Sequence, residues 1–341
     1  MTVPFDPSQV SERWADWRAS VDLDEYDQRW TRLEQSGAST HGEADLIERV
    51  LADCGGGAVL DAGCGMGRVA IELARRGVEI EGADLDPDLL AYARRHAPEL
   101  TWHHADLATM QLPRRYRVVA MPGNVMIFCR PEHRRAIVHT VAQHLEPGGA
   151  VVASFALEQG RTALTLDEYD ALCADCELTL VARFATWEGA PYGGGSYAVS
   201  VHRRADRFNV HDLLYQARSR IDRIGPARLA ELLEGSAPPL VVDTRTQTDR
   251  ARFGVIAGSI HVPRTVLEWH LDPANGYRHP AVHSFGQPIV VVCNRGYSSS
   301  LGAASLIDIG FTAVADLVGG MHAWITEGRP VVPADHDHLD F

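Results

Sequence analysis

The sequence lacks three features: long apolar runs, runs rich in Lys and Arg, and the paired cysteine spacing of a zinc site. It contains no stretch of roughly 18 apolar residues, which excludes a transmembrane helix. Its formal net charge is −13 and it has no Lys/Arg-rich run, so a nucleic acid is an unfavourable partner. Its six cysteines show no paired zinc spacing, so we expect reduced thiols and no metal site. The first residues lack the basic and apolar regions of a signal peptide, and we therefore expect a cytoplasmic protein with no membrane partner.

The sequence does contain a long alternation of strand and helix patterns. From residue 58 to residue 205, apolar strands alternate with helices, which predicts a mostly parallel sheet covered by helices on both faces. The alternation breaks only at its end, where the short turn GAPYGGG joins two strands into an antiparallel hairpin. It restarts near residue 224 with strands such as LVVDTR and PIVVVC, which predicts a second, smaller α/β domain.

These patterns divide a chain of 341 residues into two domains, each long enough to bury its own core. Near-helical spacing of Trp14, Trp17 and Tyr26 predicts amphipathic helices that cap the first domain, with the aromatic side chains engaged in packing. We expect a first domain over residues 1–205 with its helical cap over 1–50, a linker over 206–221, a second domain over 222–332 and a tail over 333–341.

The first concentrated motif is the nonapeptide VLDAGCGMG at residues 59–67. A buried strand runs into Asp61, and the glycines at alternate positions let the backbone turn sharply and approach a ligand. Asp84, at the end of the next strand, would accept hydrogen bonds from the two ribose hydroxyls of an adenosine cofactor. A dinucleotide-binding loop would need a third small residue where this chain has Arg68, which disfavours the alternative of an NAD-dependent oxidoreductase.

This motif resembles the cofactor loop of class I S-adenosylmethionine (SAM)-dependent methyltransferases. The resemblance implies a seven-stranded Rossmann-like sheet, SAM as cofactor and a small-molecule methyl acceptor. It places Asp106 near the adenine amino group and Leu107 beside the ring, while Glu43 is either a proton acceptor or the N-terminal acid of a helix. The residues expected to bind the cofactor are Asp61, Gly63, Gly65, Gly67, Asp84, Leu85, Asp106, Leu107, Asn124 and His41.

The second motif is the loop from Cys293 to Ser299, which follows an apolar strand and precedes a helix. Successive backbone N–H groups and a helix N-terminus would point at the sulfur, favouring the thiolate and later a persulfide anion. The loop resembles the active loop of rhodanese sulfurtransferases, and the resemblance covers nearly all of residues 224–332. It implies Cys293 as nucleophile and a sulfur donor such as thiosulfate.

Two positions in this loop depart from related patterns. The rhodanese pattern places an arginine where this chain has Ser298, so we expect Arg295 to supply the cation. A phosphatase loop would need an arginine at the position of Ser299, which disfavours phosphatase activity. A non-catalytic binding module stays open as the alternative for this domain.

The sequence thus predicts a SAM-dependent methyltransferase fused to a rhodanese-type sulfurtransferase that uses a Cys293 persulfide. The joining of the two suggests a sulfur compound as methyl acceptor. The alternative is an N- or O-methyltransferase of a small molecule with a regulatory rhodanese-like module. Oligomeric state and the identity of the acceptor are not predicted.

Overall fold

The computed structural model describes residues 10–35, 41–157 and 163–334. The chain divides into two compact units, Met1–Arg207 and Phe208–Phe341. Most of the predicted tail, residues 335–341, lies outside the described residues.

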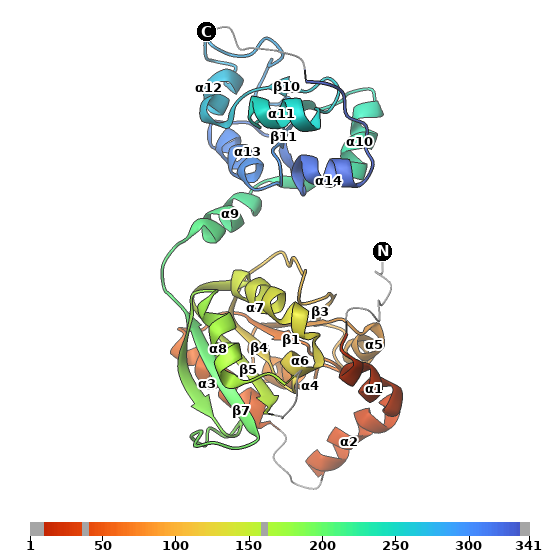
Figure 1. Cartoon of the computed structure of the whole chain (residues 1–341), viewed down its shortest axis with the longest axis vertical. Helices are drawn as coiled ribbons and strands as arrows, with labels where there is room; N and C mark the ends of the chain where they lie inside the picture. The colour runs from red at the N-terminus through yellow and green to blue at the C-terminus, as the bar shows by residue number, and fades with distance from the viewer. Residues whose placement is uncertain (1–9, 36–40, 158–162, 335–341) are drawn as a thin grey trace. The chain divides into compact units, whose positions relative to one another are not determined.

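The first unit is built on a seven-stranded sheet with the order β3-β2-β1-β4-β5-β7-β6 (Figure 1). All neighbouring strands are parallel except β7, which runs antiparallel to both β5 and β6. This confirms the predicted mostly parallel sheet with an antiparallel end. The strands are β1 Val59–Ala62, β2 Ile80–Asp84, β3 Thr101–His104, β4 Tyr116–Met121, β5 Leu145–Ala156, β6 Leu178–Phe184 and β7 Tyr197–Arg204.

Helices cover both faces of this sheet, which explains why all four residues of β1 are buried. One face packs against α3 (Gly42–Asp53), α4 (Arg68–Arg75) and α5 (Pro87–His96). The opposite face packs against α6 (Val125–Phe128), α7 (Arg134–Gln143) and α8 (Leu166–Ala174), and the short 3-10 turn Pro131–His133 precedes α7.

Two N-terminal helices, α1 (Glu12–Ser20) and α2 (Leu23–Gln35), are attached to the edge of the sheet where the parallel strands end. Arg18 pairs with Asp86 at 2.8 Å, and the Ser11 hydroxyl donates to the carbonyl of Phe128 at 2.7 Å. The Trp17 ring lies 6.0 Å from the ring of Phe128. These contacts place aromatic side chains of the cap over the strand ends.

The second unit has a five-stranded parallel sheet with the order β10-β9-β11-β12-β8. Its strands are β8 Asp222–Ile224, β9 Leu240–Asp243, β10 Ile260–His261, β11 Ile289–Val292 and β12 Val314–Leu317. Its helices are α9 Val210–Arg218, α10 Pro226–Glu234, α11 Gln247–Phe253, α12 Leu267–Leu271, α13 Ser298–Asp308 and α14 Gly320–Thr326, with the 3-10 turn Arg264–Val266 before α12.

Helix α9 occupies most of the segment predicted as a linker. A capping box starts the helix, with the Asn209 side chain accepting from the backbone N–H of Asp212 and the Asp212 carboxylate accepting from that of Asn209. Leu214 and Ala217 are buried, and α9 packs against α13. The segment therefore belongs to the second unit. Its sequence did not indicate this, because most of its residues are polar or charged and only two of its apolar positions are buried.

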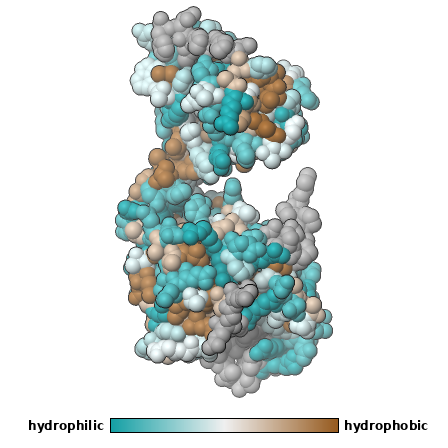
Figure 2. Space-filling view, in the orientation of Figure 1, coloured by the Kyte–Doolittle hydropathy of each residue, from teal (hydrophilic) through white to brown (hydrophobic). Residues whose placement is uncertain are grey.

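Hydrophilic residues cover most of the face shown in Figure 2 and are interrupted by smaller hydrophobic patches. Among the described residues, no helix combines the length and the apolar content needed to cross a bilayer.

Gly320 lies where the second unit packs closely against the Cys293 loop, so its substitution measures how tight this packing is. A Cβ at Gly320 (φ +60°) would lie 2.3 Å from the carbonyl oxygen of Cys293, whereas a Cβ at Gly328 (φ +70°) would meet nothing within 4 Å. Gly320→Ala should therefore lower the free energy of unfolding by more than ~2 kcal/mol, and Gly328→Ala by about 1 kcal/mol. Scanning calorimetry of the two variants checks this, and equal losses would contradict the packing described.

Candidate functional site

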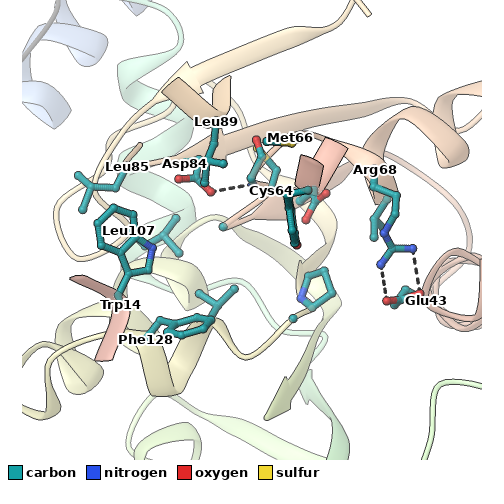
Figure 3. A pocket seen from close by; sticks show the side chains of 18 of the residues that line it. Trp14, Glu43, Cys64, Met66, Arg68, Asp84, Leu85, Leu89, Leu107 and Phe128 are labelled. Atoms are coloured by element: carbon teal, nitrogen blue, oxygen red, sulfur yellow. Dashed lines mark hydrogen bonds and ion pairs between the residues drawn. The ribbon is translucent and has the colours of Figure 1, made fainter. Parts of the chain in front are cut away.

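A cavity of about 450 Å³ lies at the edge where the parallel strands of the first sheet end, and Figure 3 shows part of its lining. The strand ends, the N-terminal helices and the segment after β4 all contribute side chains. Eight of the ten predicted cofactor residues line it: His41, Asp61, Gly63, Gly65, Asp84, Leu85, Asp106 and Leu107.

Asp61 is the most unusual group in this cavity. It is 1% exposed, and neither carboxylate oxygen has a hydrogen-bond partner among the described residues. Burial raises the pKa of Asp61 from 3.8 to about 7. The charge of Arg68 and the backbone of Ala70 act in the opposite direction but do not outweigh burial. A cationic ligand would stabilise the charged form of this carboxylate further.

Asp84 anchors the glycine loop. One carboxylate oxygen accepts the backbone N–H of Gly65 at 2.7 Å, the contact drawn in Figure 3, and the other accepts that of Asp86 at 2.9 Å. Burial raises the pKa of Asp84 to about 6, although these backbone hydrogen bonds favour the ionised form. The remaining lone pairs of this carboxylate are available to ligand hydroxyls.

Gly67 and Asn124 do not line the cavity. A Cβ at Gly67 would lie 2.4 Å from the ring of Trp102, so this glycine permits close packing behind the loop. Asn124 has a left-handed backbone (φ 72°), and its side-chain oxygen accepts the backbone N–H of Ala156 at 2.8 Å. Both residues shape the walls of the site from outside the cavity.

The structure adds lining groups that the sequence analysis did not assign to the site. Trp14, Trp17, Tyr26 and Phe128 form an aromatic wall, although the sequence analysis gave the first three to packing. Helical spacing alone does not distinguish an aromatic side chain that packs on the domain from one that faces a cavity at the domain's edge.

Arg68 and Glu43 form a bidentate ion pair in the same cavity (Figure 3). The Arg68 guanidinium contacts the two oxygens of Glu43 at 2.5 Å and 3.2 Å. Glu43 also lies in the first turn of α3. Because both oxygens of Glu43 are engaged by Arg68, this pair suits Glu43 better to orienting a ligand than to accepting a proton.

The residues present fit SAM. The cavity volume falls within the roughly 300–1,000 Å³ typical of small-molecule sites. SAM carries an ammonium and a sulfonium, and the unpaired Asp61 carboxylate offers a counter-charge for a cation. The Asp84 carboxylate can accept hydroxyl protons, while Leu107 and the aromatic wall provide apolar surface for a ring.

The second site lies at the end of β11, where Cys293 is 6% exposed. Its sulfur accepts the backbone N–H of Gly296 at 3.2 Å and lies 3.2 Å from the hydroxyl of Ser299. Burial acts to raise the pKa of the Cys293 thiol, but hydrogen bonds from Ser298, Ser299 and the loop backbone outweigh it, and the pKa is lowered. The loop therefore favours the thiolate of Cys293 more than solvent does.

A buried polar network lies beneath this loop. Asp316 is 0% exposed and accepts hydrogen bonds from the hydroxyls of Ser300 at 2.6 Å and Ser299 at 3.4 Å. The guanidinium of Arg223 pairs with the same carboxylate at 2.8 Å. Arg295, the cation expected from the sequence, has an exposed side chain. The fixed charges beneath the loop thus come from β8 and β12, far from Cys293 in sequence.

Comparison with known families finds a match in each of the two units. Residues 59–149 match the family model of a methyltransferase domain, and residues 225–327 match that of a rhodanese-like domain. The thiosulfate sulfurtransferase GlpE of Pseudomonas paraeruginosa is 36% identical over 113 residues, which are 33% of this chain and 88% of GlpE.

Two curated methyltransferases resemble the first unit. The dTDP-3-amino-3,4,6-trideoxy-alpha-D-glucopyranose N,N-dimethyltransferase of Streptomyces venezuelae is 34% identical over 32% of this chain and 46% of its own length. The magnesium-protoporphyrin O-methyltransferase of Rhodobacter capsulatus is 33% identical over 37% of this chain and 62% of its own length. The chain thus spans less than two thirds of either relative.

A solved structure, the TehB-like SAM-dependent methyltransferase from Corynebacterium glutamicum, is 30% identical and covers 53% of this chain and 97% of its own, with a TM-score of 0.47. The fold and the two matched segments define a two-domain α/β protein. The chain belongs to both families, because it joins a class I SAM-dependent methyltransferase domain to a rhodanese-like domain.

Asp61→Asn should stabilise the free protein. Folding raises the pKa of Asp61 from 3.8 to about 7, so ionising this carboxylate costs stability as the pH rises through that interval, and the full cost is present at pH 8. The neutral amide avoids this cost, and we expect a gain on the order of 2 kcal/mol at pH 8 that shrinks toward pH 4. Thermal unfolding at the two pH values measures it.

The same variant should bind SAM at least tenfold more weakly, since it removes the counter-charge of the cavity. Calorimetric titration of SAM measures the affinity, with Asp53→Asn on the exposed face of α3 as the matched control. A variant that is no more stable at pH 8, or that binds SAM as tightly as the native chain, contradicts the role given to Asp61.

Proposed function

We propose that the protein is a SAM-dependent methyltransferase of a small molecule that also transfers sulfane sulfur through Cys293. The methyltransferase unit is assigned to residues 1–205 and the sulfurtransferase unit to 222–332. One observation carries the proposal: each unit places a polar group that can act on a ligand at the end of a central parallel strand. These groups are the unpaired Asp61 carboxylate and the hydrogen-bonded Cys293 sulfur.

For methyl transfer, the chain's task is binding, alignment and exclusion of water. Bound SAM supplies a methyl group on a sulfonium. Asp61 pairs with a cationic group of the ligand, Asp84 accepts ribose hydroxyls, and the aromatic wall keeps water from the reacting atoms. We assign further cofactor contacts to His41, Gly63, Gly65, Leu85, Asp106 and Leu107, which line the same cavity.

For sulfur transfer, the Cys293 thiolate attacks the outer sulfur of thiosulfate. The S–S bond of thiosulfate breaks, and sulfite leaves with the bonding electron pair. Cys293 then carries a persulfide anion, stabilised by the N–H of Gly296 and the hydroxyl of Ser299. An acceptor such as cyanide or a thiolate takes the outer sulfur and restores the Cys293 thiolate.

We propose a sulfur compound as the methyl acceptor. The support is the covalent joining of a methyl-donor site to a sulfane-sulfur site, which raises the effective concentration of one product at the other site. A thiolate or persulfide also needs no proton acceptor, which suits a cavity whose Glu43 is held by Arg68.

An amine or hydroxyl is the second candidate acceptor, with the rhodanese-like unit as a regulatory module. Among the described residues, six carboxyl side chains and two arginines line the cavity, and this balance favours a neutral or cationic acceptor. The two curated relatives described above are named as N- and O-methyltransferases.

Cys293 should be the cysteine that accepts sulfane sulfur. Incubation with thiosulfate should add one sulfur to the intact protein and localise it to the peptide that contains Cys293. The reason is that this sulfur accepts the backbone N–H of Gly296 and lies 3.2 Å from the hydroxyl of Ser299. Cys293→Ser should abolish both the mass increase and thiocyanate formation, while Cys176→Ser, which changes a thiol whose pKa is raised by burial, should leave them intact. Absence of a persulfide in the native chain would favour the regulatory alternative.

The choice of acceptor is tested with labelled SAM, thiosulfate and a low-molecular-weight thiol. A sulfur acceptor predicts a methylated sulfur product whose formation falls at least tenfold in Cys293→Ser, because the persulfide is its source. Cys176→Ser again serves as the control. A methylated amine or hydroxyl product formed equally fast by Cys293→Ser would overturn the sulfur acceptor and leave the methyltransferase assignment standing.

A further inference from the structure

Helix α9 lies outside the matched rhodanese-like segment, yet its last residue, Arg218, reaches the Cys293 loop. One guanidinium nitrogen donates to the carbonyl of Gly296 at 2.9 Å, and another donates to the hydroxyl of Ser300 at 3.3 Å. The same guanidinium lies 5.6 Å from the ring centre of Tyr297. The Arg218 side chain therefore contacts both the loop, at Gly296 and Tyr297, and the first turn of α13, at Ser300.

The carbonyl of Gly296 is the acceptor of the shorter Arg218 hydrogen bond. The Ser300 oxygen at 3.0 Å and an Arg223 nitrogen at 3.5 Å also lie close to this carbonyl oxygen. Gly296 has φ +72°, and its N–H is the group that donates to the Cys293 sulfur at 3.2 Å. Fixing the carbonyl of this residue fixes the left-handed turn that aims the N–H at the sulfur.

The loop's own sequence provides no fixed cation at the position where the resembling pattern has one. Ser298 stands at that position, and the Arg295 side chain is exposed. Arg218 is half-buried, and burial and the neighbouring Arg223 lower its pKa, whereas Asp316, Tyr297 and Cys293 act in the opposite direction.

We propose that Arg218 is a positioning residue of the sulfurtransfer site: it holds the Gly296 turn that aims the N–H of Gly296 at the Cys293 sulfur. The proposal rests on the sulfurtransfer function assigned to Cys293. It extends the site to α9, a helix that precedes the rhodanese-like segment and that the sequence analysis assigned to a linker.

The charged and titratable groups around this loop come from several elements. One is His322 on α14, whose backbone N–H donates to the carbonyl of Asn294 at 3.0 Å. The others are Arg218 on α9, Arg223 on β8, Asp249 on α11 through its contact with Asn294, Arg295 and Tyr297 on the loop, and Asp316 on β12.

The test is the pH dependence of Cys293 alkylation by iodoacetamide, followed by peptide mass spectrometry in the full chain. Arg218→Gln removes the charge and one donor, and we expect the midpoint of alkylation to move upward by about one pH unit, with about tenfold slower alkylation below the midpoint. Arg218→Lys keeps the charge but cannot bind Gly296 and Ser300 as a planar fork, so its shift should be smaller.

Arg220→Gln is the matched control, because Arg220 lies two residues on and pairs with exposed Asp308 instead of the loop. It should alkylate as the native chain does. A native midpoint in Arg218→Gln overturns the proposal. If that variant does not fold, Arg218→Lys decides: slower alkylation supports the proposal, and native behaviour overturns it.

Alkylation needs no sulfur donor, so this result is independent of the assigned function. If the native chain forms no persulfide with thiosulfate while Arg218→Gln still shifts the midpoint, the sulfurtransfer assignment fails and the role of Arg218 in tuning the thiol stands.

Discussion

A buried carboxylate must be paired or must lose its charge, and both units are organised around this constraint. In the second unit, Asp243 is bound by Arg245 at 2.7 Å and Asp316 by Arg223 at 2.8 Å, so their charges are satisfied within the protein. In the first unit, Asp61 has no such partner among the described residues. The same type of group is therefore structural in one unit and available to a ligand in the other.

The sequence predicted what depends on local patterns. Strand and helix alternation predicted both sheets, and the spacing of acid and glycines around Asp61 placed the cavity at the correct edge, because carboxyl ends of parallel strands converge. The sequence did not predict which side chains of one element would contact another element. Asn124 turns to the backbone of Ala156, and the contact between Arg68 and Glu43 depends on how α3 packs on α4. Such contacts follow from tertiary packing, which leaves no periodic signal.

The segment after the first unit shows the same limit. Residues 208–221 look polar because the capping residues and the arginines dominate, and the buried apolar positions of α9 are Leu214 and Ala217. Arg218 then reaches a loop that is 78 residues away in sequence. A domain boundary drawn where a family pattern begins removes this helix, and with it a cation of the site, so truncated chains would lack part of the site that they are meant to isolate.

The second unit favours the thiolate of Cys293 through the hydrogen bonds of its loop. Ultraviolet difference titration of the native chain against Cys293→Ser isolates the thiolate absorbance of this one residue. The structure predicts a titration midpoint below that of a free cysteine titrated under the same conditions, because the loop's hydrogen bonds outweigh burial and lower the pKa of Cys293. A midpoint at or above that value would show that burial prevails, and it would contradict the account of the site.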